Sequence, residues 1–236
     1  MTSVAVQAQG SEVMEPVAPF WHTGILVAGA AVLAVLGALV QHHAGLERRS
    51  GGSPIPLYLS LLAAEWGLFR FVRKGSLRSG TKLDDLIGRN WAKPRELLLD
   101  GLLGLSLLVF WELLESAWRH WAGIDNSVSV QGMLPREPLG RVLWVAVSVS
   151  AGFCEEVAFR GYCQRQFAAL TRSRWIGLLL QALLFGVCHA YEGLQACLKI
   201  ALYGILFGLL ALWRRSLRPG MICHALSDIA AGLFGF

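Results

Sequence analysis

The chain has 236 residues, of which 55% are hydrophobic and 16% are charged, and its formal net charge is +5. With a mean hydropathy of +0.51, it is too apolar for an ordinary soluble domain, and several apolar runs are long enough to cross a bilayer. The basic residues lie between these runs and form no compact basic domain, which argues against a nucleic-acid partner. The composition predicts an all-α, polytopic transmembrane helix bundle.

The N-terminal half contains three predicted membrane helices. Residues 1–20 lack the basic start of a secretory signal peptide, and we expect them to form a disordered tail. The apolar segments 25–40, 56–72 and 97–118 follow. The second of them contains Glu65, for which a structural role in the bundle is favoured because no motif surrounds it.

A basic connection and four further apolar segments set the predicted topology. Residues 70–95 hold eight Lys and Arg residues, which places this loop on the cytoplasmic side. With this loop inside, a bundle of about seven or eight membrane helices has its N-terminus in the cytoplasm. The expected location is a plasma or inner membrane. The remaining apolar segments start near 142 and cover 175–190, 194–213 and 222–236.

The five cysteines are odd in number and scattered through apolar segments, so a disulfide framework is not expected. Three of them precede a glutamate or histidine that is discussed below, which leaves a thiolate or metal site as an alternative. Neighbouring helical residues point about 100° apart, however, so buried, inert thiols are favoured. The cysteines are Cys154, Cys163, Cys188, Cys197 and Cys223.

Two adjacent glutamates and an arginine end the fourth apolar segment. Charged groups inside a membrane cost about 2.5 to 3.5 kcal/mol each, so they persist mainly where they are paired or take part in chemistry. Glu156 and Arg160 are four residues apart, share a helical face and are predicted to form an ion pair. Glu155 points about 140° away from Arg160 and is free to face a cavity. It reaches mid-membrane if the helix starts later than residue 142 and continues past Arg160 towards Gln166, which we predict.

His189 and His224 lie in later apolar segments. Phe185 is four residues before His189, and Asp228 is four residues after His224, so each pair shares a helical face. A carboxylate and a histidine at one water molecule supply the base and the acid of peptide hydrolysis, and a second histidine can stabilise an oxyanion. Interhelical hydrogen bonding is the alternative for each residue alone. Together they favour an enzyme.

These residues form three short motifs that resemble those of a known family. The motifs are Glu155-Glu156-Val-Ala-Phe-Arg160, Phe185-Gly-Val-Cys-His189 and His224-Ala-Leu-Ser-Asp228. They are similar in order and spacing to the Glu-Glu-x-x-x-Arg, Phe-x-x-x-His and His-x-x-x-Asn/Asp motifs of the CPBP family, the membrane-embedded CAAX-type proteases and bacteriocin-processing enzymes. The helices before residue 142 are similar only in being membrane helices.

The resemblance implies an intramembrane glutamic endopeptidase that acts on membrane-anchored or C-terminally processed proteins or peptides within the lipid bilayer. Glu155 with His189 would activate water, and His224 with the residue at position 228 would stabilise the oxyanion. Glu156, Arg160 and Phe185 would support the motif helices. Residues 142–236 would form the catalytic core, and residues 21–141 would be accessory helices with the basic loop 70–95.

Asp228 departs from the family pattern, because this position is often Asn. An ionised aspartate would repel an oxyanion, so Asp228 must either be protonated or orient His224 as its hydrogen-bond acceptor. We favour the second role.

A metal cofactor and two other functions are the alternatives. Glu155, His189 and His224 could supply three ligands to a catalytic zinc, but the chain has no His-Glu-x-x-His pair on one helix, and no cofactor is expected. A non-catalytic scaffold or immunity protein would keep the same polar contacts. A secondary transporter would use Glu65, Lys199 and Glu155 in ion coupling, yet the two halves of the sequence show no repeat.

Overall fold

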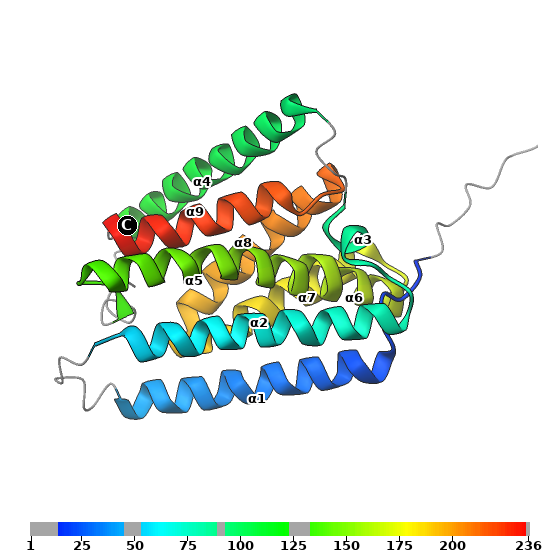
Figure 1. Ribbon diagram of the computed structural model, residues 1–236, viewed down its shortest axis with the longest axis horizontal. Helices are drawn as coiled ribbons and strands as arrows, with labels where there is room; N and C mark the ends of the chain where they lie inside the picture. The colour runs from blue at the N-terminus through cyan, green and yellow to red at the C-terminus, as the bar shows by residue number, and fades with distance from the viewer. Residues whose placement is uncertain (1–13, 45–52, 89–92, 123–132, 235–236) are drawn as a thin grey trace, which may run out of the picture.

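The computed structural model describes residues 14–44, 53–88, 93–122 and 133–234, and within these ranges the chain is helical without strands (Figure 1). The predicted all-α class is confirmed. The helices are α1 Phe20–Ala44, α2 Ile55–Arg78, α3 Leu83–Ile87, α4 Pro94–Ala122, α5 Pro138–Glu156, the π-helical η2 Val157–Cys163, α6 Gln164–Thr171, α7 Arg174–Cys188, the short 3-10 helix η3 Ala190–Glu192, α8 Leu194–Arg214 and α9 Arg218–Phe234.

Five of the described helices are long and apolar enough to cross a membrane: α1, α2, α4, the continuous α5–η2–α6 helix and α8. The predicted fifth and seventh spans correspond to α7 and α9, which are shorter, so the count of seven stays a prediction. The chain is an integral, multi-pass membrane protein.

The motif helix runs without interruption from Pro138 to Thr171. The predicted continuation past Arg160 is confirmed, whereas the predicted start after residue 142 is wrong, because the helix already begins at Pro138. At about 1.5 Å per residue, Glu155 lies ~24 Å from Thr171, and His189 lies ~22 Å from Arg174 at the start of α7. The two side chains therefore reach a similar depth from the same end of the bundle.

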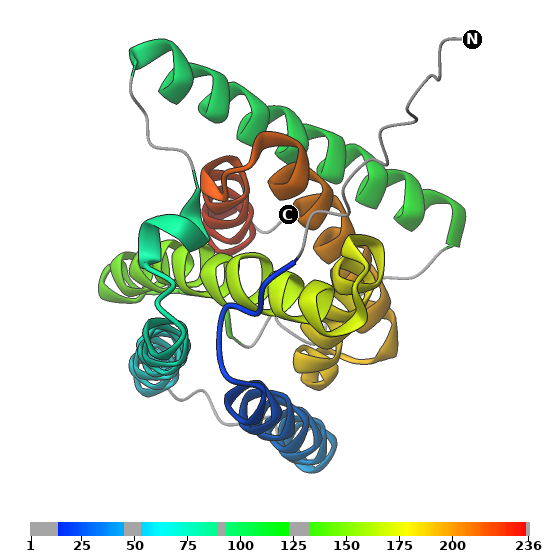
Figure 2. The same cartoon turned by 90° about the vertical axis from the view of Figure 1, so that its right-hand side faces the viewer.

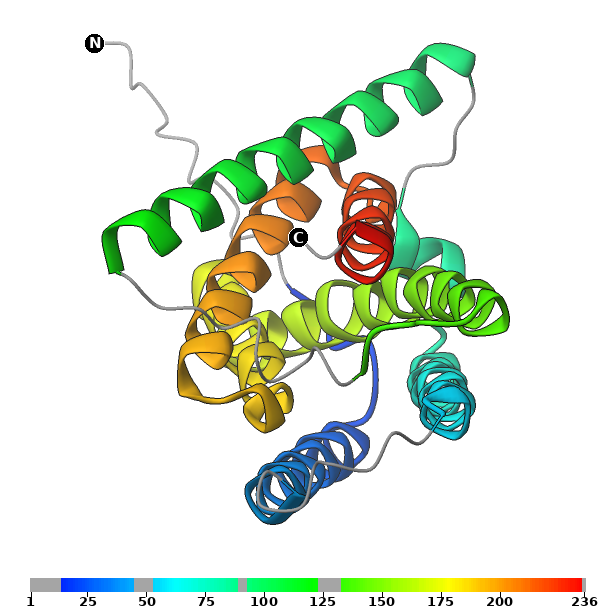
Figure 3. The same ribbon diagram turned by 90° about the vertical axis from the view of Figure 1, so that its left-hand side faces the viewer.

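The α5 helix occupies the middle of the bundle. The α2 helix packs along one side of it and α9 along another, and α1 packs against α7 and η3 (Figures 1 and 3). The α4 helix crosses over α8 and α9 on the side of α5 that is remote from α1 (Figure 2). Two ion pairs join α4 to α8, between Asp100 and Arg214 and between Glu115 and Lys199.

Close backbone contacts at two glycines bring the motif helices together. A Cβ atom on Gly152 would lie 2.9 Å from the Met221 carbonyl oxygen and 2.9 Å from the Ala225 nitrogen, so only glycine allows this approach of α5 to α9. A Cβ atom on Gly186 would collide with the Cys197 carbonyl oxygen of α8. These contacts fix the positions of Glu155 and His189, each of which follows one of the two glycines by three residues.

The N-terminal segment is packed where a loose tail was expected. Val17 and Ala18 are buried. The Gln166 side chain accepts a hydrogen bond from the Ala18 N–H (3.1 Å) and donates one to the Ala18 carbonyl (2.8 Å). The disordered tail predicted for residues 1–20 is therefore wrong at these two residues, and residues 1–13 lie outside the described part of the chain.

The predicted basic loop 70–95 is also more ordered than expected, because α2 continues to Arg78 and α3 follows it. Arg165 donates to the Asp85 carbonyl, and Arg218 donates to the Gly88 carbonyl. These bonds hold the connection and its basic residues against the starts of α6 and α9. The end of α2, α3 and the start of α9 lie at the same end of the bundle, on the right in Figure 1.

Candidate active site

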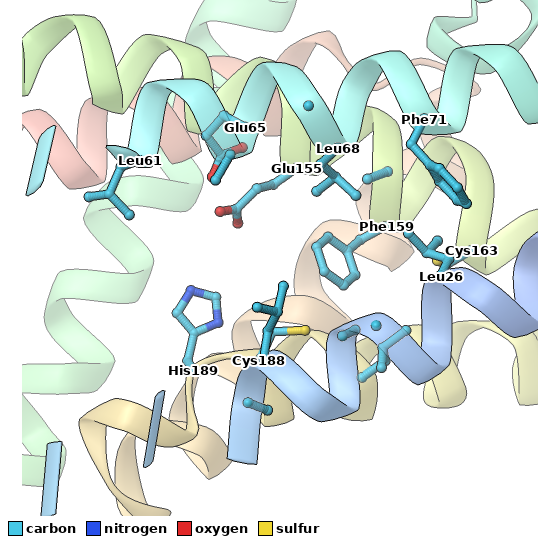
Figure 4. A pocket seen from close by; sticks show the side chains of 18 of the residues that line it. Leu26, Leu61, Glu65, Leu68, Phe71, Glu155, Phe159, Cys163, Cys188 and His189 are labelled. Carbon is cyan, nitrogen blue, oxygen red and sulfur yellow. The ribbon is translucent and has the colours of Figure 1, made fainter. Parts of the chain in front are cut away.

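A cavity of about 610 Å³ lies between α1, α2, the α5–η2 helix and α7. Its walls are largely apolar, and Glu65, Glu155 and His189 are its acidic and histidine residues (Figure 4). Glu155 and His189 thus face one space, although they come from different motifs. His224 and Asp228 do not line this cavity.

Glu155 projects from the last turn of α5 into the cavity, and its side chain is 14% exposed. Its Oε2 atom lies 3.8 Å from His224 Nε2 and has no hydrogen-bond partner in the described structure. This carboxyl group is therefore available to a molecule in the cavity, as the separation of the two glutamates predicted.

Glu156 points in the other direction and is buried in an ion pair. Arg160 Nη1 donates to Glu156 Oε1 over 2.9 Å, and both side chains are almost completely inaccessible. The predicted ion pair is confirmed. A buried charge without its partner is strongly unfavourable, so this pair fixes both side chains.

His224 is held by Glu156. Its Nδ1 lies 3.1 Å from Glu156 Oε1, and because a carboxylate only accepts, Nδ1–H is the donor. Asp228 Oδ2 lies 3.7 Å from His224 Nε2, beyond hydrogen-bonding distance, and its side chain is 38% exposed. The role favoured from the sequence for Asp228, as the acceptor that orients His224, is therefore wrong in this structure.

His189 has a defined tautomer when it is neutral. Its Nδ1 lies 2.8 Å from the Phe185 carbonyl oxygen, one helical turn back. A carbonyl oxygen cannot donate, so Nδ1 carries the proton and Nε2 has the lone pair. The ring can accept a proton at Nε2 while its orientation is maintained.

Phe185 connects the three motifs through its ring. The Arg160 guanidinium carbon lies 4.2 Å from the Phe185 ring centroid, a cation–π contact. The same ring meets His189 edge-on at a centroid distance of 4.9 Å and His224 at 6.0 Å. These contacts give a physical basis for the supporting position predicted for Phe185.

The π-helical turn η2, from Val157 to Cys163, directly follows the two glutamates. Such widened turns are rare and occur often at functional sites. Periodicity alone does not reveal one, so the sequence reading missed it, together with the Glu156–His224 hydrogen bond and the approach of Glu65 to Glu155.

The alternatives raised by the sequence find little support in the geometry. In the described part of the chain, no three His, Cys, Asp or Glu side chains are grouped so that they could hold a metal ion. All five cysteines are free. Lys199 lies on α8 and donates to Glu115 of α4, so it does not join Glu65 and Glu155 in the cavity as the transporter hypothesis requires.

Comparison with known proteins supports the family that the motifs suggested. Residues 137–230 match the family model described as type II CAAX prenyl endopeptidase, Rce1-like, and this segment contains all three motifs. No curated protein and no solved structure gives a match.

Proposed function

We propose that the chain is an intramembrane protease, as the match of residues 137–230 to the Rce1-like CAAX endopeptidase family supports, and that it hydrolyses peptide bonds by a glutamate- and histidine-activated water molecule. The observation that carries the proposal is the placement of Glu155 and His189 in one cavity, with the next glutamate turned away to hold His224.

In the proposed reaction, Glu155 accepts a proton from a water molecule that attacks the carbonyl carbon of the substrate. The Nε2 lone pair of His189 orients this water. Glu155 then passes the proton to the departing amine, so that one water is consumed and the carboxylate is regenerated.

The oxyanion that forms during attack requires donors that are already in place. His224 supports this role because Glu156 fixes its ring through Nδ1, which leaves Nε2 directed towards Glu155 and Asp228. With both ring nitrogens protonated, Nε2–H donates to the oxyanion. Asp228 contributes by attracting the imidazolium rather than by orienting the ring.

The substrate is a membrane-anchored protein or peptide whose cleaved segment enters the apolar cavity. Apart from Glu65, the walls contributed by α1 and α2 are formed by Leu, Ala, Gly, Ile and Phe residues, which suit an apolar segment.

We also place the N-terminus in the cytoplasm of a plasma or inner membrane. The gathering of basic residues around α3, the end of α2 and the start of α9 supports this orientation, because cytoplasmic ends are enriched in Lys and Arg. Labelling of single cysteines introduced next to Arg78 and Glu137, in sealed vesicles, tests it.

The proposed function is tested with purified protein in liposomes and a membrane-anchored reporter. We expect cleavage by the wild type and by Glu137→Gln, an exposed carboxylate outside the site, and a loss of more than about 10²-fold in kcat for Glu155→Gln and His189→Ala. Equal cleavage by all four proteins would contradict the enzymatic function.

A further inference from the structure

A second glutamate, Glu65 of α2, lies in the cavity beside Glu155 of α5 (Figure 4). The two carboxyl groups are within hydrogen-bonding reach of each other. One oxygen of each, Oε2, is buried and has no hydrogen-bond partner in the described structure. Two acidic side chains from different helices therefore meet at the point where the proposed chemistry takes place.

Contact between two carboxyl groups has a chemical requirement. Ionised carboxylates have acceptors only and repel each other, so the pair is stable as a hydrogen-bonded unit when it holds one proton. Within the described ranges, no Lys or Arg forms an ion pair with Glu65 that would neutralise it. Arg160, Lys199 and Arg214 are paired with the other acids Glu156, Glu115 and Asp100.

We propose that Glu65 is a positioning residue that shares one proton with Glu155 and holds the Glu155 carboxylate towards the cavity. This inference rests on the proposed function, because Glu65 acts only by positioning Glu155, the general base of that reaction. It replaces the purely structural role that the sequence suggested for Glu65.

The Glu65–Glu155 pair holds one proton both before and after one turnover. At rest Glu65 carries the proton and donates a hydrogen bond to the Glu155 carboxylate. Glu155 takes a proton from water as the new O–C bond forms, and gives this proton to the amine nitrogen as the C–N bond breaks. The Glu65 proton stays in the pair, which returns to one proton without any co-reactant.

Other ionisable groups surround the pair and have to be considered in any measurement of its protonation. They come from the end of α7, from α9, which lies behind Glu155 and outside the cavity lining, and from the motif helix itself. They are His189, His224, Asp228 and Arg160.

A simple structural bond between α2 and α5 is the competing explanation, and Glu65→Gln separates the two. Glutamine keeps the shape and a hydrogen-bond donor but cannot carry the exchangeable acid proton. We expect kcat to fall by about 10- to 100-fold with KM unchanged, while Glu137→Gln leaves both constants unaltered. A Glu65→Gln variant with wild-type kcat overturns the inference.

Infrared spectroscopy of the same proteins provides a readout independent of activity. The difference spectrum of wild type minus Glu65→Gln should contain the C=O stretch of a protonated carboxyl group, and wild type minus Glu137→Gln should not. Absence of this band from the first difference spectrum overturns the shared proton, even where activity falls. If Glu65→Gln does not fold, Glu155→Gln gives a second test, because Glu65 then keeps its proton but loses its carboxylate acceptor. The C=O band should remain and shift in frequency, and an unshifted band overturns the shared proton.

The outcomes also separate this inference from the proposed function. Cleavage by Glu155→Gln at the wild-type rate would contradict the proposed function and this inference with it. Loss of cleavage in Glu155→Gln together with a fully active Glu65→Gln would leave the proposed function intact and contradict the role of Glu65 alone.

Discussion

His224 donates from Nδ1 to Glu156 Oε1 over 3.1 Å, and the same oxygen accepts from Arg160 over 2.9 Å. The second glutamate of the motif is therefore a bridge between its own helix and the third motif. Glu155 and Glu156 point in different directions from the helix: Glu155 lines the cavity, and Glu156 fixes the His224 ring through Nδ1.

This relationship predicts that Glu156 matters more than Asp228 for the orientation of His224. Glu156→Ala removes the acceptor and leaves the Arg160 charge buried without a partner, which costs about 3 to 5 kcal/mol. Asp228→Ala removes only a charge 3.7 Å from Nε2. We expect a larger loss of reporter cleavage and of thermal stability in Glu156→Ala.

The ranking of these two variants is the decisive comparison. If Asp228 oriented His224, Asp228→Ala would lose more activity than Glu156→Ala measured at a temperature where both are folded. Circular dichroism in detergent establishes that temperature, and Glu137→Ala serves as a surface control.

Arg160 is predicted to depend on its shape as well as its charge. Its guanidinium lies 4.2 Å from the Phe185 ring centroid and 5.2 Å from that of Phe207, and a lysine ammonium cannot stack in this way. Arg160→Lys should lower the free energy of unfolding by about 1 to 2 kcal/mol. Arg141→Lys, an exposed position on the same helix, should change it little, and equal melting curves for the two variants would contradict the prediction.

Cleavage is predicted to be independent of a metal ion. The described His, Cys, Asp and Glu side chains form no group of three suited to a metal, and His224 Nδ1 is already engaged with Glu156. Incubation with a tight chelator should leave the initial rate of reporter cleavage unchanged. A loss of activity that added zinc restores would show that this prediction is wrong.

Several features were predictable because they depend on helical spacing alone. The apolar runs gave the helical class, and the four-residue spacing of Glu156 and Arg160 gave their ion pair. The need to place Glu155 at mid-membrane gave the continuation of the helix past Arg160. Each of these follows from the geometry of one helix and the cost of charges in a membrane.

Contacts between helices were not predictable in the same way. The approach of Glu65 to Glu155, the acceptor chosen by His224, and the burial of Ala18 against Gln166 all depend on how α1, α2, α5 and α9 rotate and pack. Asp228 and Glu156 are both reasonable acceptors for His224 by residue type, and only the packing of α9 on α5 decides between them. The widened turn η2 likewise has no signature in hydrophobic periodicity.

Gly152 is predicted to control the distance between the first and third motifs. A methyl group at this position would lie 2.9 Å from the Met221 carbonyl oxygen and 3.0 Å from the Ala225 Cβ, so Gly152→Ala has to push α9 away from α5. Overpacking of this kind costs about 1 to 3 kcal/mol. Because His224 directly precedes Ala225, the displacement also lengthens its bond to Glu156.

Gly101→Ala is the matched control, since a methyl group on Gly101 of α4 meets nothing within 4 Å. We expect Gly152→Ala to lose both thermal stability and reporter cleavage, while Gly101→Ala retains both. Wild-type cleavage by a folded Gly152→Ala protein would show that the α5–α9 contact does not position His224.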